Sequence, residues 1–124
     1  MPRTPKTPHA ATDWIADDLI HLIIDYYPEV QFRPYGSGAT RENILPALRE
    51  IKPGYIVVYA KGHSGYTTYP GSLHTEHRML AQDMLAFFRK VTRETGVKFF
   101  PYYSGLVDGI AGMRHPEWRM RNVD

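Results

Sequence analysis

The fold is decided by a short apolar run, Tyr55-Ile56-Val57-Val58-Tyr59-Ala60, which leads directly into the polar stretch Lys61-Gly62-His63-Ser64-Gly65-Tyr66. β-Branched and aromatic residues dominate the apolar run, as in a parallel strand that is covered on both faces. Hydrogen-bonding side chains at the carboxyl end of such a strand lie where α/β folds bind their ligands. The stretch therefore predicts a binding loop for a polar small molecule.

Two further apolar runs predict strands on either side of this one. The first covers residues 19–27 and carries Asp25 near its end, and the second covers residues 97–104. The second run contains Pro101, which lacks the N–H that a central strand needs. Pro101 therefore predicts either a bulge or an early end of the third strand.

A helical pattern lies between the first and second strands. Its apolar positions recur every three or four residues, at Ile44, Leu45, Leu48 and Ile51. Either Thr40 or Asn43 can cap this helix, and the following Pro53 ends it. Pro46 favours Asn43 as the cap, because Pro46 would then lie in the first turn, where a missing N–H costs nothing.

A second helix is predicted from Thr75 to Thr95, with Gly96 as its left-handed C-terminal residue. After the third strand, residues 105–112 are expected to form a loop that carries Asp108. Residues 115–119 read His-Pro-Glu-Trp-Arg and predict another short helix, in which Trp118 belongs to the core.

The order strand, helix, strand, helix, strand predicts an α/β fold with a parallel βαβαβ unit. Such a unit can begin a (β/α)8 barrel or form half of a doubly wound sheet. No Gly-x-Gly-x-x-Gly pattern follows the first strand. A dinucleotide site is therefore not expected.

Composition narrows the class of protein further. The chain has 124 residues, a length that suits one domain. Its net charge is only +2 and its basic residues are scattered, so neither a nucleic-acid nor a membrane partner is expected. The absence of cysteine excludes disulfides, thiolate metal sites and thiol nucleophiles. Residues 1–12 are proline-rich and apolar-poor, so we expect a disordered tail, no signal peptide and a cytoplasmic protein, with the domain over 13–124.

Tyrosines are the most unusual feature of the composition. Nine are present, and they cluster at the ends of the three apolar runs. Tyrosines at strand ends either cap the core with their solvated hydroxyls or line a binding face.

Three segments together resemble a known group of enzymes: residues 60–66 (AKGHSGY), 96–104 (GVKFFPYYS) and 115–119 (HPEWR). They are similar to the N-terminal part of fucosidase-like glycoside hydrolases, the group called hypothetical glycosyl hydrolase 6. A looser similarity reaches the α-L-fucosidases of glycoside hydrolase family 29, in which a Lys-His-His-Asp-Gly-Phe motif ends the second barrel strand. The resemblance runs in order from about residue 19 to Asp124, and it implies an incomplete TIM-type (β/α)8 barrel represented by its first three strands.

The resemblance also implies roles for single residues. Lys61, His63, Gly65 and Tyr66 match the lysine, second histidine, glycine and aromatic residue of the family 29 motif, in which histidines contact the hydroxyls of the sugar. This sequence departs from the motif in two places, with Gly62 and Ser64 standing where that family has histidine and aspartate.

In such enzymes the nucleophile follows the fourth barrel strand and the acid/base residue comes later, and a full barrel takes about 250 residues. We therefore expect this chain to supply sugar-binding loops but not the nucleophile, and its catalytic residues stay unassigned. The expected partners are a carbohydrate and either a complementing chain or further copies of this one. The alternative is an inert α/β unit that self-associates or binds a partner or carbohydrate through its unpaired strand edges.

Glycoside hydrolysis uses two carboxyl groups, and the candidates at strand ends are Asp25 and Asp108. Each either contacts the substrate or serves the backbone, Asp25 by accepting N–H groups and Asp108 by beginning a turn. Lys61 either binds the sugar or forms an ion pair between strands. Tyr66 either stacks on the sugar or packs the loop. Tyr103, at the end of the third strand, completes the expected substrate-binding set.

Two other chemistries fit the sequence less well. His74 and His77 are three residues apart, but no third ligand stands at a diagnostic spacing, so neither a metal nor any other cofactor is expected. A serine nucleophile elbow would need glycine where Tyr66 stands.

Overall fold

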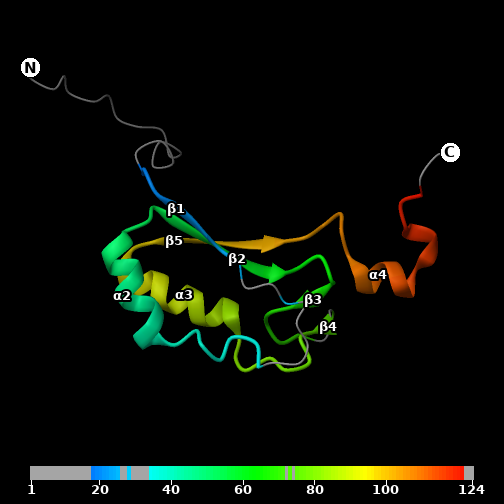
Figure 1. Ribbon diagram of the computed structural model, residues 1–124, viewed down its shortest axis with the longest axis horizontal. Coiled ribbons are helices and arrows are strands. Elements are labelled where there is room, and N and C mark those ends of the chain that lie inside the picture. The colour runs from blue at the N-terminus through cyan, green and yellow to red at the C-terminus, as the bar shows by residue number, and fades with distance from the viewer. Residues whose placement is uncertain (1–17, 26–27, 29–33, 72, 74, 122–124) are drawn as a thin grey trace, which may run out of the picture.

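The computed structural model describes residues 18–25, 28, 34–71, 73 and 75–121. The expected tail over residues 1–12 lies outside the described residues, as does His74. The elements in chain order are β1 (His21–Ile24), α2 (Arg41–Ile51), β2 (Tyr55–Lys61), β3 (Tyr66–Thr67), β4 (Thr75–Glu76), α3 (Met84–Thr95), β5 (Lys98–Tyr103), α4 (Gly109–Arg114) and the 3₁₀ helix η1 (Pro116–Trp118) (Figure 1).

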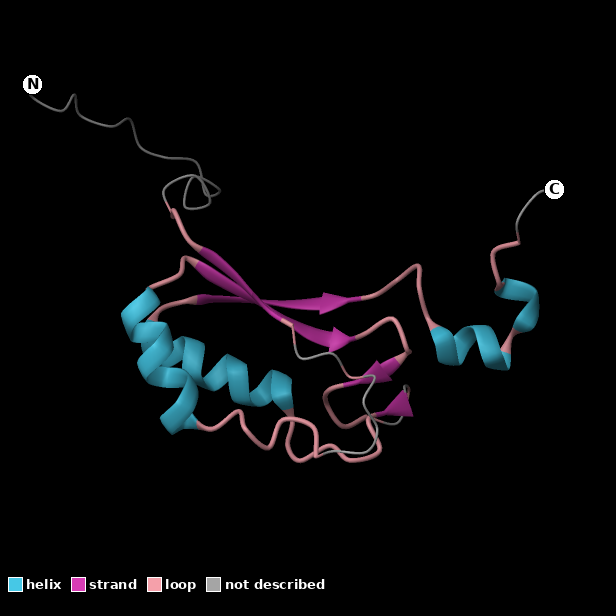
Figure 2. Ribbon diagram, in the orientation of Figure 1, coloured by secondary structure: helices cyan, strands magenta, loops and turns pink. Residues whose placement is uncertain are grey.

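The sheet is parallel where the sequence predicts it to be. β2 is the central strand, and both β1 and β5 pair with it in parallel, so that Tyr55 aligns with His21 on one side and with Lys98 on the other. The strands therefore stand in the order in which they occur along the chain. Helices α2 and α3 both cover the same face of these strands (Figure 2). The predicted α/β class with a parallel βαβαβ unit is confirmed.

The core lies between the helices and one face of the sheet. Ile56 and Val58 of β2 are fully buried there, against Leu48 of α2 and Phe88 of α3. The alternate residues of β2 are only half-buried. The prediction that β2 is covered on both faces is therefore wrong for the described residues, because only the helix-facing side has a layer packed on it.

Neighbouring aromatic rings partly shield the second face of the sheet. Tyr55 stacks on His21 with 4.0 Å between ring centroids and meets Phe100 edge-on at 5.3 Å. Tyr59 and Tyr102 approach to 4.7 Å farther along the same strands. Cross-strand ring pairs of this kind stabilise a sheet from the side that the helices do not cover.

Helix α2 begins earlier than predicted. Its N-cap is Thr40, whose hydroxyl oxygen accepts the Asn43 N–H at 3.3 Å, whereas the Asn43 amide donates to the carbonyl of Gly38. The choice of Asn43 as the cap was wrong, and Pro46 consequently lies inside the helix. The C-cap is Lys52, in the left-handed conformation with φ of 50°.

Helix α3 begins later than predicted, at Met84 instead of near Thr75. The side chain of Asp83 caps it by accepting the Ala86 N–H at 2.9 Å, and Gly96 ends it with φ of 75°, as expected. The stretch at Thr75 instead forms β4, which pairs with β3, and β3 turns back antiparallel to β2. The backbone groups of Thr75 and Glu76 therefore pair with β3 and are not available for hydrogen bonds within a helix.

Pro101 lies in the middle of β5 without ending it. Among the described strands, β5 pairs only with β2, so it is an edge strand, where a residue without an N–H is tolerated. The register irregularity falls between Tyr59 and Lys61 on the partner strand. In the described part of the chain, no helix is both long enough and apolar enough to cross a membrane.

Candidate functional site

The carboxyl edge of β2 and β5 brings three of the predicted site residues together. The Lys61 ammonium lies 2.6 Å from Asp108 Oδ2 and 4.6 Å from the centroid of the Tyr103 ring. The Lys61 side chain is 4% exposed and the Asp108 side chain 25%. Lys61 thus forms an ion pair, but with the residue that caps α4 and not with a residue of another strand, as its alternative role had it.

Both carboxylate oxygens of Asp108 are engaged. Oδ2 accepts from Lys61, and Oδ1 accepts the Ala111 N–H at 2.8 Å, so that Asp108 is the N-cap of α4. The prediction of a loop over residues 105–112 is therefore wrong after Asp108, because α4 begins at Gly109. Burial raises the pKa of Asp108, but the hydrogen bonds from Ala111 and Lys61 and the charge of Lys61 outweigh it, and the pKa lies below its ordinary value.

The loop after β2 is fastened to the start of α4 by its backbone. The carbonyl oxygens of His63 and Ser64 accept the N–H groups of Gly109 and Ile110 at 2.9 and 3.0 Å. Gly65 closes the loop with φ of 94°, and a side chain there would collide with the Asp108 carboxylate. The loop and α4 thus form one local unit.

His63 faces a cavity of about 570 Å³ beside this unit. The cavity is also lined by residues 105–109, by Asp108 within them, and by Trp118, Arg119 and Met120. The His63 ring is partly buried, and its Nε2 lies 3.4 Å from the Tyr102 hydroxyl oxygen. A volume of this size falls within the range of about 300–1,000 Å³ typical of small-molecule sites.

A smaller cavity of about 180 Å³ adjoins the same residues. It is lined by Lys61, Asp108, Arg114 and Trp118, among others. Asp108 and Trp118 therefore border both cavities, one from the cap of α4 and the other from η1.

The remaining predicted site residues lie outside both cavities. Tyr66, on β3, meets the buried His77 edge-on with 6.3 Å between ring centroids. Asp25 is exposed after β1, and the ring of Tyr103 lies beside Lys61. Of the predicted set, the two cavities collect Lys61, His63 and Asp108.

Trp118 is the residue that the sequence interpretation missed. It was assigned to the core, but it is 66% exposed, so that assignment is wrong. Its ring stacks on His115, with 3.9 Å between centroids and 13° between planes. The signal was present in the spacing: residues three apart eclipse one another in a 3₁₀ turn, and Pro116 favours such a turn at its first position.

A metal site finds no support in the described residues, which contain no group of three or more histidine, cysteine, aspartate or glutamate side chains placed to hold an ion. His77 is 1% exposed, and its Nδ1 accepts the Met79 N–H at 3.1 Å. That nitrogen is therefore used in the local backbone structure.

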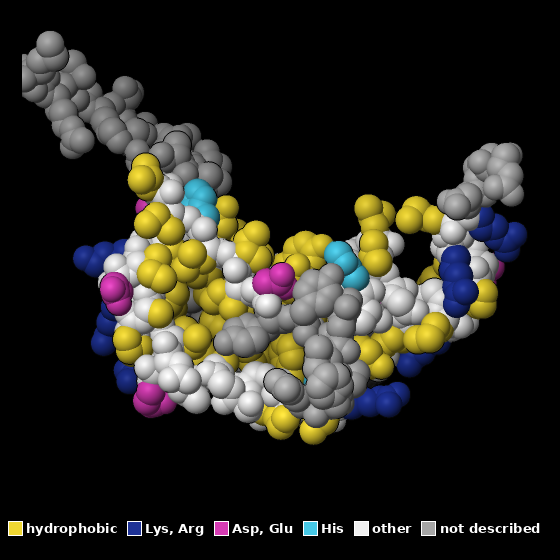
Figure 3. Space-filling view, viewed as in Figure 1, with side chains coloured by type: hydrophobic (Ala, Val, Ile, Leu, Met, Phe, Trp, Pro, Cys, Tyr) yellow, Lys and Arg dark blue, Asp and Glu magenta, His cyan; other side chains and the backbone are white. Residues whose placement is uncertain are grey.

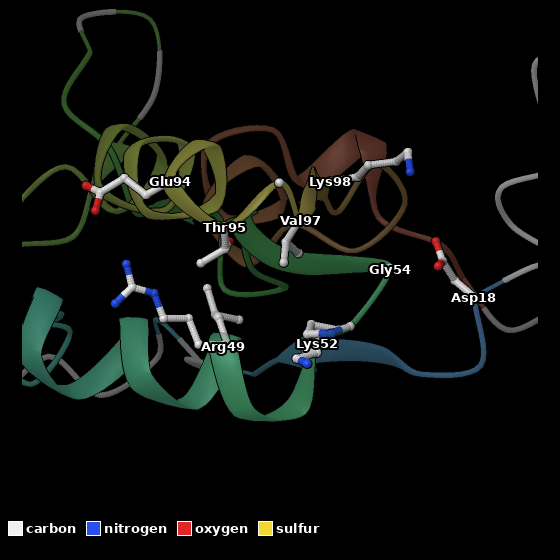
Figure 4. Close-up of a pocket in the computed structure, with 11 residues that line it drawn as sticks. Asp18, Arg49, Lys52, Gly54, Glu94, Thr95, Val97 and Lys98 are labelled. Atoms are coloured by element: carbon white, nitrogen blue, oxygen red, sulfur yellow. The ribbon is translucent and has the colours of Figure 1, made fainter.

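A third cavity, of about 490 Å³, lies at the opposite edge of the sheet (Figure 4). Charged side chains of both signs line it: Asp18, Arg49, Lys52, Glu94 and Lys98. The C-terminal ends of α2 and α3 meet there, and helix C-termini carry partial negative charge. Ligands of open parallel sheets bind at the carboxyl edge instead, so we place the candidate site with His63.

The fold and the position of the site define an α/β unit with a parallel sheet and a candidate binding edge at the carboxyl ends of its strands. No family model matches the sequence, and no curated protein matches it. Among solved structures, the chain is similar to α-L-fucosidase isoenzyme 2 from Paenibacillus thiaminolyticus, with a TM-score of 0.71 and 26% sequence identity over 83% of this chain. The chain spans 15% of the length of that protein. The similarity supports a fucosidase-like fold, in agreement with the resemblance in the sequence.

Proposed function

We propose that this chain supplies sugar-binding loops to a glycoside hydrolase of the α-L-fucosidase type, as the first three strands of a (β/α)8 barrel. The observation that carries the proposal is the His63 cavity at the carboxyl edge of β2 and β5, in a unit similar to an α-L-fucosidase. The three parallel strands β1, β2 and β5 lie side by side in chain order, with the helices on one face, which is how such a barrel begins.

His63 is the proposed sugar contact. An imidazole both donates and accepts hydrogen bonds, which suits the hydroxyl groups of a sugar. The Tyr102 hydroxyl, 3.4 Å from Nε2, helps to orient the ring. Lys61 and Asp108 hold the loop in place beneath it, so their proposed contribution to binding is positional.

The proposed function leaves the nucleophile to residues other than Asp108. Retaining and inverting enzymes need two carboxyl groups on either side of the scissile bond, about 5–5.5 or 6.5–9.5 Å apart. Asp108 already accepts from Lys61 and from Ala111, and its lowered pKa makes it a poor proton donor at neutral pH. Asp25 is exposed and lines neither cavity.

Binding of L-fucose to the full chain, measured by NMR titration, tests the proposal. We expect a dissociation constant on the order of 1 mM for the wild type and at least a fivefold weaker one for His63→Ala. His21→Ala is the matched control, because His21 is exposed on β1 at the other end of the strands, and it should bind as the wild type does. An aryl α-L-fucoside should not be turned over.

Two results would contradict the proposal separately. If the wild type and the His63→Ala variant bind fucose equally, or if neither binds it, the sugar-binding role fails. If the isolated chain hydrolyses the aryl fucoside efficiently, the proposal that this chain does not supply the nucleophile fails.

A second candidate function, self-association or docking of a complementing chain, has one observation in its favour. The face of the sheet opposite the helices exposes large apolar side chains, with Ile23 at 70%, Phe100 at 42% and Tyr102 at 37%. Figure 3 shows hydrophobic side chains along the strands. Apolar faces of this kind often mark contacts with other protein.

A further inference from the structure

We infer that Trp118, backed by His115, forms a stacking platform for a second sugar ring next to the one that His63 contacts. The inference rests on the proposed sugar-binding function and extends it from one ring to two. It concerns a residue that lies within one segment of the resemblance, residues 115–119, but that the predicted site did not include.

The indole of Trp118 is both exposed and held in place. Its side chain is 66% exposed, although burial is the usual outcome for so large an apolar ring. The ring of His115 covers one face at 3.9 Å, nearly parallel, and the backbone N–H of Trp118 donates to the His115 carbonyl at 3.0 Å, which closes the turn that joins the two residues. Stacking on His115 therefore limits the motion of the indole before a ligand arrives, which reduces the entropy lost on binding.

The position of Trp118 links it to His63. Trp118 lines the 570 Å³ cavity together with His63 and also lines the 180 Å³ cavity that contains Lys61. The larger cavity offers more room than a single pyranose ring fills. A ligand of two linked rings would therefore reach from His63 to the indole.

An arginine lines each of the two cavities that Trp118 borders. Arg119 lines the larger cavity and is fixed by a 2.7 Å hydrogen bond from its Nε to the Gly112 carbonyl. Arg114 lines the smaller one and donates to the Thr75 hydroxyl at 3.1 Å. An aromatic face in cavities that also contain guanidinium groups suits a pyranose ring, whose C–H face is apolar and whose edge carries hydroxyls.

The two proposed contacts also belong to one local unit. The backbone of α4 donates to the carbonyl oxygens of His63 and Ser64, and the His115 N–H donates to the Ala111 carbonyl at 2.8 Å. The chain from the His63 loop through α4 to Trp118 is thus connected by short backbone hydrogen bonds. Such a connection keeps the spacing between the two ring sites constant.

The test compares methyl α-L-fucoside with an α-L-fucosyl-galactose disaccharide by NMR titration of the full chain. We expect the wild type to bind the disaccharide about fivefold more tightly than the monosaccharide. Trp118→Ala should lose this gain while keeping its affinity for the monosaccharide within about twofold. Trp118→Phe, which retains a ring, should keep part of the gain.

Met113→Ala is the matched control, because Met113 lies on α4, is 65% exposed, has no ring and lines neither cavity. It should retain the full disaccharide gain. The inference is overturned if Trp118→Ala retains the gain, or if Met113→Ala loses as much of it as Trp118→Ala does. A wild type that binds the monosaccharide but shows no disaccharide gain overturns the inference and leaves the proposed function standing. A wild type that binds neither sugar overturns both.

Discussion

Asp108 joins two parts of the molecule through its two carboxylate oxygens. One oxygen accepts from the buried Lys61, which lies 47 residues earlier in the chain, and the other caps α4 at Ala111. Asparagine could keep the cap, but its amide nitrogen would donate toward a lysine that only donates. At the residue scale, the negative charge of Asp108 therefore stabilises the fold through Lys61, separately from the oxygen that caps α4.

This reasoning gives a pH-dependent prediction for Asp108→Asn. At pH 7 the variant should be less stable than the wild type by about 3 kcal/mol, because it leaves Lys61 buried without an anion. Since the pKa of Asp108 is lowered in the folded state, its contribution is complete above the unfolded pKa of about 3.9 and is lost as the pH falls through the folded value. Urea unfolding of both proteins at pH 7, 5, 4 and 3 measures the difference.

Other carboxylates titrate in the same range, so the comparison depends on the difference between the two proteins. Glu94, for example, also has a lowered pKa, because of its hydrogen bond to Arg41. Its contribution cancels in the difference. A stability gap that stays constant from pH 7 to pH 3 would show that the Lys61–Asp108 charge pair does not stabilise the fold.

At the element scale, the loop after β2 depends on Gly65. Its φ of 94° is strained for any other residue, and an added Cβ would meet the Asp108 carboxylate and Ile110. We expect Gly65→Ala to destabilise the protein by about 2 kcal/mol or more. Amide hydrogen exchange over α4 should also become faster, because the collision lies at the helix cap.

Gly105→Ala is the control for this prediction. Gly105 lies in the connection between β5 and α4, and nothing lies within 4 Å of a Cβ added there. Its effect should stay within about 0.5 kcal/mol. Equal effects of the two substitutions would mean that the left-handed turn at Gly65 is not what fixes the loop.

The elements also show which parts of the fold a sequence can predict. β1, β2 and β5 and the end of α3 follow from local signals: apolar runs and a glycine at a helix end. The start of α3 does not, because Thr75 pairs with Tyr66 on β3, and a non-local pairing leaves no periodic trace.

The site divides in the same way. His63 and Asp108 follow strands and were predicted from that position. The exposure of Trp118 depends on where α4 docks, and the partner of Lys61 depends on a contact that joins distant parts of the chain. Motifs and strand ends therefore identify candidate site residues in the sequence, whereas the contacts that these residues make are known only from the structure.

At the scale of the whole molecule, the apolar sheet face opposite the helices predicts association. We expect the wild type to form dimers or larger species in a concentration-dependent manner, as measured by light scattering. The double variant Ile23→Lys, Phe100→Lys should be monomeric, because two like charges would oppose burial of this face.

Leu73→Lys provides the comparison, because Leu73 is 90% exposed but lies between β3 and β4, away from the face. It should associate as the wild type does. A wild type that remains strictly monomeric over a wide range of concentrations would count against both self-association and the use of this face by a copy of the chain.

The attachment of the His63 loop to α4 has a consequence for protein engineering. The attachment uses the carbonyl oxygens of residues 63 and 64, and every residue type supplies that group. The side chains at these two positions can therefore be randomised while the loop stays anchored, provided that Gly65 and Asp108 are retained. A library restricted to positions 63 and 64 would explore new ligand preferences on a backbone that the library itself does not disturb.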